Sequence, residues 1–202
     1  MHGLLGKINR NHSGHSSRII LVRDSKRESL SYHHPVMTTA HIALGANLGD
    51  RRGNILAALE CLRQTPAISI SRISSFLENP AIGGPMDSPP FLNAAVEIQT
   101  NLGSHALLHR LMEIERELGR DRREKWEPRI IDLDLLLFDN HIISSQELVV
   151  PHPLMHERRF VLEPLMEIAP DAVHPVLQMT VAGLLEDLNR KGAGENRNQK
   201  FE

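Results

Sequence analysis

The stretch from Gly119 to Phe138 constrains the fold of this chain more than any other part of its sequence. It begins with a loop rich in Arg and Lys, which Pro128 prevents from continuing as a helix. A run of Ile and Leu follows, with the composition and length of a buried strand, but it contains Asp132 and Asp134. Carboxylates inside an apolar strand are costly unless a partner compensates their charge. The stretch therefore predicts a strand that carries a charged site at its start.

Asp132 and Asp134 are two positions apart, so on a strand their side chains point to the same face. Two like charges that close repel each other unless a cation lies between them. Hard divalent cations such as Mg²⁺ are commonly held by one or two carboxylates together with substrate phosphates, and arginine suits phosphate groups. An isolated Asp pair or arginine run is more often a solvated surface. Their direct succession here favours a site for a metal and a phosphate.

The composition indicates a folded chain with room for one domain. Of its 202 residues, 41% are hydrophobic and 24% are charged, which is typical of a soluble globular protein. No segment approaches the roughly 18 consecutive apolar residues that a membrane span needs, so no membrane partner is expected. The single cysteine, Cys61, excludes an internal disulfide and a multi-cysteine zinc site. Its apolar helical surroundings indicate a buried structural thiol, and a reducing cytoplasm is the simplest compartment.

The charge of the chain is distributed unevenly. The net charge is −2, but residues 1–36 hold six Lys and Arg against two Asp and Glu, so they carry +4 and the rest carries −6. An acidic body argues against broad nucleic-acid binding. No nucleic-acid partner is expected, and an anionic ligand must be held by a local basic cluster or through a metal.

Residues 1–36 are expected to form a disordered N-terminal extension. They are rich in His, Ser, Arg and Asn and contain one short apolar run. Met37 directly precedes the first well-patterned segment, so the extension is interpreted as an appendage or an upstream mis-start. The folded domain is expected over residues 37–189, and the polar residues 190–202 are expected to be a disordered tail.

Secondary-structure signals alternate along the central part of the chain. Asp50 is suited to cap a helix that ends before Pro66, and Ser104 is suited to cap a second helix that Gly119 ends. The predicted strands cover approximately 41–45, 67–77, 91–100 and 130–138, and a loop dense in Pro and Gly covers 79–90. Beyond them, a hairpin is predicted at 141–150, a helical piece at 155–169 and a short helix at 181–189.

The resulting order is β, α, β, β, α, β with C-terminal additions. It predicts an α+β fold of the ferredoxin-like or split βαβ type, with an antiparallel-rich sheet and its helices on one face. Such a fold does not define a function, because RNA-binding domains share it. The aromatic-rich motif that those domains place on their central strands is missing from this sequence.

Several motifs follow one another at a characteristic spacing. They are Gly45-Ala-Asn47-Leu48, Phe91-Leu-Asn93-Ala-Ala, Glu115 with Leu118-Gly119-Arg120, Trp126-x-Pro128-Arg129-x-x-Asp132-Leu-Asp134, and Pro151-His152 followed by Arg158-x-Phe160. With these motifs the chain resembles the 6-hydroxymethyl-7,8-dihydropterin pyrophosphokinase family from about Ala40 to about Asp187. The resemblance implies a folate-pathway enzyme in which ATP donates its β,γ-pyrophosphoryl group to the pterin hydroxymethyl group and leaves as AMP.

The resemblance also implies roles for individual residues. Asp132 and Asp134 are expected to hold two Mg²⁺ ions that bridge the triphosphate and help to activate the attacking hydroxyl group. Arg120 and Arg129 are expected to neutralise the phosphates and to act in catalysis with the two aspartates. The remaining residues expected on the ATP side are Glu115, Arg122, Trp126, which would belong to a mobile lid, His152 and Arg158.

On the pterin side, the resemblance implies that Asn93 reads the hydrogen-bonding edge of the ring, and that Phe91 and Phe160 sandwich the ring. Backbone groups near Asn79 and Ile82 are expected to assist. The expected partners are the two small-molecule substrates, and the expected oligomeric state is a monomer. The chain departs from the family at Glu127, where a small residue is usual, and at Pro153, where some relatives have an aromatic residue.

The chemistry of the residues is consistent with this activity but does not select it alone. Phosphoryl-type transfer needs positioning and charge neutralisation more than a covalent nucleophile, and no Ser/His/Asp or Cys/His set is apparent in the sequence. One alternative is a non-catalytic ferredoxin-like module that binds nucleotides or RNA. Another is a different metal-dependent phosphotransferase or phosphohydrolase that uses the same Asp pair without a pterin.

Overall fold

The computed structural model describes residues 37–80, 89–119 and 129–198, and its elements belong to one unit that spans Thr38–Glu202. At its centre is a five-stranded sheet in the order β2-β4-β1-β5, with β3 also paired to β4. Every neighbouring pair is antiparallel. The strands are β1 (Thr38–Ala46), β2 (Ile68–Ile73), β3 (Leu77–Asn79), β4 (Phe91–Thr100) and β5 (Asp132–Phe138).

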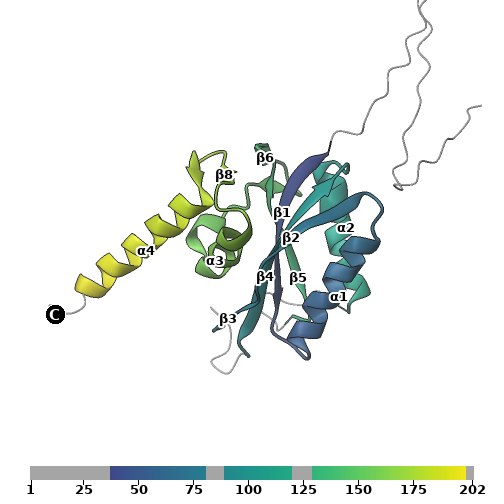
Figure 1. Cartoon of the computed structure of the whole chain (residues 1–202), viewed down its shortest axis with the longest axis horizontal. Coiled ribbons are helices and arrows are strands. Elements are labelled where there is room, and N and C mark those ends of the chain that lie inside the picture. Colours follow the sequence, from purple (N-terminus) through teal and green to yellow (C-terminus); the bar gives the residue numbers. More distant parts are fainter. Residues whose placement is uncertain (1–36, 81–88, 120–128, 199–202) are drawn as a thin grey trace, which may run out of the picture. The chain divides into compact units, whose positions relative to one another are not determined.

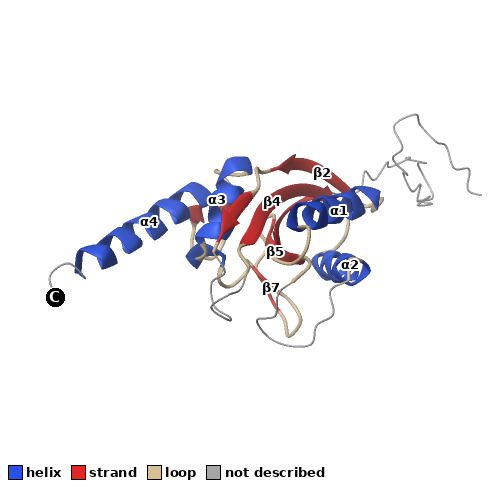
Figure 2. Cartoon of the chain, turned by 90° about the horizontal axis from the view of Figure 1, so that it is seen from below, coloured by secondary structure: helices blue, strands red, loops and turns tan. Residues whose placement is uncertain are grey.

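Helices α1 (Arg51–Gln64) and α2 (Ser104–Glu117) cover one face of this sheet (Figure 2). The predicted cap of α1 is confirmed, because the Asp50 side chain accepts a hydrogen bond from the amide of Gly53 at 2.9 Å. Apolar residues at helical spacing turn one side of each helix into the core. On α1 these are Ile55, Leu59 and Leu62, and on α2 they are Leu107, Leu111 and Ile114.

The C-terminal part covers the opposite face of the sheet (Figure 1). Alternate residues of the central strands, such as Ala95 and Leu136, face a second apolar cluster with Leu162 and Leu165 of α3. Central strands buried on both faces need such a second layer. Its elements are the short helix Met155–Glu157, α3 (Arg159–Ile168), α4 (Val181–Asn198) and the hairpin of β8 (Val173–His174) and β9 (Met179–Thr180). The hairpin of β6 (Ile143–Ser144) and β7 (Val149–Val150) instead packs with the first cluster, on the side of α2.

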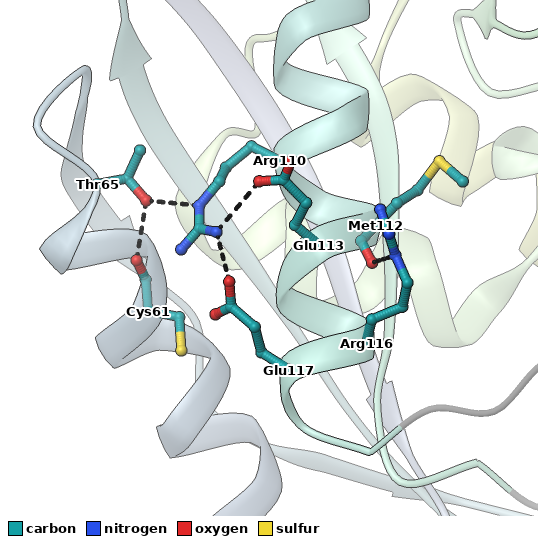
Figure 3. A network of polar contacts seen from close by, with 7 residues as sticks. All are labelled: Cys61, Thr65, Arg110, Met112, Glu113, Arg116 and Glu117. Atoms are coloured by element: carbon teal, nitrogen blue, oxygen red, sulfur yellow. Dashed lines mark hydrogen bonds and ion pairs between the residues drawn. The ribbon is translucent and has the colours of Figure 1, made fainter.

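Helices α1 and α2 are also joined by polar contacts on their outer side (Figure 3). Arg110 of α2 donates from Nε to the Thr65 hydroxyl oxygen at 3.0 Å, and Thr65 in turn donates to the carbonyl of Cys61 at 2.9 Å. The same guanidinium group reaches Glu117 at 2.8 Å and Glu113 at 3.3 Å. Cys61 itself is a free thiol that packs against the core, but it is half-buried and not buried as predicted.

Two predictions about helix ends are corrected. Ser104 does not cap α2: the N-cap is Gly103 without a side-chain hydrogen bond, and the Ser104 hydroxyl lies 3.4 Å from the ring of His105. The last helix does not end at residue 189 but continues to Asn198. Asp187 pairs with Lys191 one turn later at 2.8 Å, and such pairs support a polar helix. The helix therefore extends nine residues beyond the predicted end, into the segment 190–202 that was expected to be a tail.

The other predicted elements are present, but β1 begins three residues before the predicted range, the hairpin of β8 and β9 was not predicted, and the second strand is divided. The predicted second strand is interrupted after Ile73, because Ser74 turns its hydroxyl oxygen onto the amide of Ala95 at 2.9 Å, and pairing resumes in β3 at Leu77. The predicted stop of α2 is confirmed, since Gly119 has φ of 93° and donates to the carbonyl of Arg116 at 3.1 Å. Within the three described ranges, no helix combines the length and apolar character needed to cross a membrane.

Candidate functional site

One row of residues runs across three neighbouring strands at the end of the sheet. Asp132 of β5 is paired with Gly45 of β1, and Gly45 is paired with Asn93 of β4. Residues directly opposite each other in an antiparallel sheet project to the same face. Two residues away, Ala95 belongs to the apolar cluster under α3. The side chains of Asp132 and Asn93 therefore project to the face that α3 covers. They lie nearer the end of the sheet than the apolar cluster does.

Asp134 joins Asp132 on this face, as predicted from their spacing. In β5 the two aspartates are half-buried, whereas Leu133 and Leu135 between and beyond them are buried in the core under α1 and α2. This alternation is what period-two geometry requires of a strand. Arg129 contacts the Asp132 carboxylate through Nη1, so one cation already lies beside the pair.

The Asp pair fits the donor set that Mg²⁺ uses. Across residues 37–80, 89–119 and 129–198, no group of three or more His, Cys, Asp and Glu side chains is arranged for a metal. Mg²⁺ differs from Zn²⁺ in that one or two carboxylates suffice when phosphates and water supply the other ligands. Asp132 keeps 20% of its side chain exposed.

Glu115 supports the strand between the two aspartates. It lies on α2 with only 2% of its surface exposed, and its Oε1 accepts a hydrogen bond from the amide of Leu133 at 2.8 Å. A carboxylate this deeply buried is tolerated only when it is well paired. Glu115 is predicted either to orient ATP or to support the site, and its position favours support, because it holds the backbone that carries both carboxylates.

Asn47 holds the start of β5 from the other side. The backbone amide of Asn47 donates to the carbonyl of Arg129 at 3.0 Å, and its side-chain Oδ1 accepts from the backbone amide of Arg129 at 2.6 Å. Its Nδ2 also lies 3.5 Å from the carbonyl oxygen of Pro89. Asn47 is 3% exposed, so these bonds are shielded from competing water.

His152 lies within electrostatic reach of both Arg158 and Asp132. The pKa of His152 is lowered chiefly by burial and then by the positive charge of Arg158, while Asp132 acts in the opposite direction. Its Nδ1 accepts a hydrogen bond from the amide of Leu154 at 3.2 Å. In neutral histidine this assigns the proton to Nε2, which makes the other nitrogen a hydrogen-bond donor.

The predicted pterin side contains amide groups that lack partners. The Nδ2 atoms of Asn79 and Asn93 are buried and have no hydrogen-bond acceptor among the described residues. A buried amide without a partner is costly, so such a pair indicates a place where a ligand supplies acceptors. Asn79 is paired with Phe91 across β3 and β4, which keeps both beside Asn93.

Gly45 leaves space between the two halves of the site. A Cβ atom added at Gly45 would lie 3.2 Å from Oδ1 of Asn93 and 3.8 Å from the ring of Phe91. The side chains of Asn93 and Phe91 therefore both lie close to the space above Gly45, the middle residue of the row. A side chain there would occupy the space next to the predicted readers of the pterin.

Phe160 is the second residue of α3, which covers the same face of the sheet. It is half-buried against the second apolar cluster, and the guanidinium carbon of Arg158 lies 5.8 Å from its ring centre. Since α3 packs against β4, β1 and β3, both predicted residues belong to the layer that covers the row. Four predicted site residues lie outside the described residues: Ile82, Arg120, Arg122 and Trp126.

Three residues of this region were not among the predicted site residues. Gly45 and Asn47 belong to the quoted motif Gly45-Ala-Asn47-Leu48, for which no individual contact is predicted. Arg51 is the third: it donates from Nη1 to the carbonyl of Pro90 at 2.7 Å. The pairing of strands and loops distant in sequence reveals all three, and the residue pattern alone contains no signal for Arg51.

Comparisons with known proteins agree on one family. The family model described as 7,8-dihydro-6-hydroxymethylpterin-pyrophosphokinase (HPPK) matches residues 41–170. The chain is 47% identical over 129 residues to the 2-amino-4-hydroxy-6-hydroxymethyldihydropteridine pyrophosphokinase of Bacillus subtilis, covering 64% of this chain and 77% of that protein. The protein of the same name from Methylorubrum extorquens is 44% identical over 137 residues, covering 68% and 86%.

Solved structures show the same fold at lower sequence identity. The crystal structure of Plasmodium falciparum HPPK-DHPS with pteroate aligns with a TM-score of 0.58 and 18% identity, covering 78% of this chain and 43% of that chain. This chain thus spans less than half of that larger protein, and the likeness concerns the fold alone. On the family match and the identity to its relatives, the chain belongs to the 7,8-dihydro-6-hydroxymethylpterin-pyrophosphokinase family and is an enzyme of folate biosynthesis.

Proposed function

We propose that the enzyme transfers the β,γ-pyrophosphoryl group of ATP to 6-hydroxymethyl-7,8-dihydropterin and releases AMP and the pterin diphosphate. The observation that carries this proposal is the row of Asp132, Gly45 and Asn93 across β5, β1 and β4. This row brings Asp132, which is proposed to hold Mg²⁺, to the same face of the sheet as Asn93, whose side-chain amide is proposed to bind the pterin. The names of the curated relatives support the same substrate.

In this reaction the hydroxymethyl oxygen attacks the β-phosphorus of ATP. The bond from that phosphorus to the oxygen that bridges it to the α-phosphate breaks, AMP departs with that oxygen, and the hydroxyl proton is released. The protein then has to align two substrates and neutralise charge rather than form a covalent intermediate. The described part of the site suits this task, because it combines Arg129 and Arg158 with two carboxylates.

Asp132 and Asp134 would hold Mg²⁺, and two ions are proposed. When bound, the metal would neutralise phosphate charge and help to acidify the attacking hydroxyl group. Arg129 contacts Asp132 and would release its Nη1 toward a phosphate as the metal binds the carboxylate. His152, with its proton on Nε2, would donate to the nucleotide beside Arg158, and Arg120 and Arg122 complete the proposed phosphate contacts.

Asn93 and Asn79 would bind the acceptor. Their buried Nδ2 atoms can donate to ring acceptors of the pterin, and this would remove the cost of leaving them unpaired. Phe91 and Phe160 would enclose the flat ring from two sides. Ile82 is proposed to contact the pterin, and Trp126 is proposed to contact ATP.

The strand order also supports a ferredoxin-like arrangement of the β1-to-β5 core. The outer strands of the order β2-β4-β1-β5 are the second and the last of the βαββαβ unit, and all pairs are antiparallel. The C-terminal additions form the layer on the second face. We further propose a monomeric, cytoplasmic enzyme that does not bind nucleic acid. Sedimentation at several protein concentrations would test the monomer, because a dimer would raise the apparent mass with concentration.

The activity is tested by incubating the full chain with ATP, Mg²⁺ and 6-hydroxymethyl-7,8-dihydropterin and quantifying AMP and ADP. The expected result is AMP formed in a one-to-one ratio with the pterin diphosphate, and none without the pterin. ADP as the sole nucleotide product would instead indicate transfer of a single phosphoryl group. AMP formation without the pterin would indicate a phosphohydrolase, and no turnover would favour a binding module.

A further inference from the structure

The geometry points to Arg51 as a positioning residue for the acceptor side of the site. This inference rests on the proposed function, because it assigns Arg51 to the binding of the pterin rather than of ATP. Arg51 is the first residue of α1 and touches neither the Asp pair nor the row of Asp132, Gly45 and Asn93. It acts through the strands β3 and β4 that carry the proposed pterin contacts.

The guanidinium group of Arg51 joins two segments that are far apart in the sequence. Its Nη1 donates to the carbonyl oxygen of Pro90 at 2.7 Å, and its Nη2 lies 3.3 Å from Oε2 of Glu78. Glu78 lies in β3, and Pro90 directly precedes the first residue of β4. One side chain therefore bridges the two strands at the end where their pairing begins.

The location of Arg51 on α1 supports this interpretation. A cation in the first turn of a helix opposes the helix dipole, which favours negative charge there. Arg51 nevertheless keeps only 29% of its side chain exposed, against 50% for Arg63 in the last turn of the same helix. Contacts outside the helix account for this position: the carbonyl of Pro90 and the carboxylate of Glu78.

The bridged strands hold the residues proposed to bind the pterin. Glu78 is paired with Leu92, and the neighbouring residue Asn79 is paired with Phe91. Because β3 has only three residues, few ladder bonds fix its register, and a contact from outside the sheet weighs more. Loss of the Arg51 bridge should loosen Asn79 and Phe91 relative to each other.

The donor half of the site has separate supports. Glu115 holds the amide of Leu133, and Asn47 holds the backbone of Arg129. Neither contact involves Arg51. A change at Arg51 should therefore raise the KM of the pterin and leave the KM of ATP nearly unchanged, whereas general loss of folded protein would lower kcat without changing either KM.

Arginine is required for this role because its planar fork reaches two acceptors at once, whereas lysine carries a single point charge. We expect the pterin KM of Arg51→Ala to rise roughly tenfold, the size expected for losing a charge-assisted hydrogen bond. Arg51→Lys should recover part of this loss, and Glu78→Gln should show a smaller rise, since it leaves the Pro90 contact intact.

The matched control is Arg63→Ala, which removes one arginine from the other end of α1. Among the described residues, the ion pair of Arg63 is with Glu60 of the same helix at 3.6 Å, so its loss should change no KM. For each variant, steady-state kinetics would give both KM values and kcat. Calorimetric titration with the dihydropterin, in the presence of Mg²⁺ and a non-hydrolysable ATP analogue, would give the pterin Kd without turnover.

Hydrogen exchange of the free proteins separates this inference from the proposed function. The amides of residues 77–79 and 91–93 should exchange faster in Arg51→Ala than in the unchanged chain or in Arg63→Ala. If the unchanged chain makes no AMP, the proposed function fails, and the exchange data still decide whether Arg51 holds β3 on β4. Unchanged exchange, an unchanged pterin KM, or equal effects in Arg63→Ala would overturn the role of Arg51.

Discussion

Asn47 and Arg129 hold each other through two hydrogen bonds that join the end of β1 to the start of β5. The amide of Asn47 donates to the carbonyl of Arg129 at 3.0 Å, and Oδ1 of Asn47 accepts from the amide of Arg129 at 2.6 Å. Asp132 follows only three positions later, at the first residue of β5. The pair therefore defines where β5 begins and where both carboxylates project.

Two substitutions at Asn47 should separate its contacts. Asn47→Ala leaves the amide of Arg129 without its acceptor and should lower the free energy of unfolding by about 1–3 kcal/mol, together with kcat. Asn47→Asp keeps an acceptor oxygen for Arg129, loses the Nδ2 contact to Pro89 and adds a carboxylate at a position that is 3% exposed. It should therefore also be less stable than the unchanged chain, but it should keep more of kcat than Asn47→Ala. Urea denaturation and steady-state kinetics of both variants measure the difference. Equal losses of kcat would contradict the importance of the Arg129 bond.

Replacement of Asp134 should abolish turnover and leave the fold nearly intact. Asp134→Ala removes one of the two proposed metal ligands, and we expect kcat/KM to fall by about 10³-fold or more, equivalent to several kcal/mol of lost transition-state stabilisation. The Mg²⁺ concentration needed for half of the remaining activity should be higher than in the unchanged enzyme. Asp171→Ala, at an exposed position outside the site, is the control for loss of one negative charge. A fully active Asp134→Ala enzyme would refute the metal assignment.

Glu115 should stabilise the fold as a hydrogen-bond acceptor for the amide of Leu133, and a neutral glutamine at this position should keep part of that stabilisation. In Glu115→Ala the amide of Leu133 loses a buried acceptor, which should cost about 1–3 kcal/mol and lower Tm by several degrees. Glu115→Gln retains a carbonyl oxygen at the same place, so it should be the more stable of the two. Calorimetric scans of both variants decide this. Identical Tm values for the two would show that the Leu133 contact does not matter.

Three histidines should make the protein less stable as the pH falls below neutrality. The pKa values of His41, His152 and His174 are all lowered, in each case first by burial. The unfolded chain therefore takes up protons near pH 6.5, before the folded chain does. Stability is present above about pH 6.5 and is lost as the pH falls toward about 5, where carboxylates scarcely titrate.

Urea denaturation at successive pH values would measure this loss. In the His41→Gln variant the dependence should be shallower, because a residue that is 6% exposed no longer has to acquire a proton on unfolding. Glu97, which lies 3.4 Å from the His41 ring, opposes the effect of burial. A stability that rises as the pH is lowered from about 7 to about 5 would mean that the pKa of these histidines is raised instead.

Local chemistry accounts for the parts of the fold that were predicted correctly. Asp50 caps α1 because its own carboxylate reaches an amide three residues later, and Gly119 ends α2 because it adopts a positive φ. Ser104 shows the limit of the same reasoning. Its residue type suits a cap, but it lies one position inside the helix, and its hydroxyl meets His105.

The candidate site divides in the same way. The spacing of Asp132 and Asp134 is sufficient to predict a shared face, since the period of a strand is a property of its own backbone. The association of Asp132 with Asn93 depends on Gly45, which is paired with both. Strand order and register between segments dozens of residues apart are not encoded in any local period.

Periodicity, helix stops and the motif spacing therefore suffice for most of the elements, for the shared face of the carboxylate pair and for the family, but not for the division of β2 from β3. The fold alone determines that Gly45 leaves space beside Asn93, that Asn47 ties β1 to Arg129, and that Arg51 bridges β3 and β4. The physical reason is that the first group depends on geometry within a few residues of chain. The second depends on hydrogen bonds between segments that meet only when the sheet has formed.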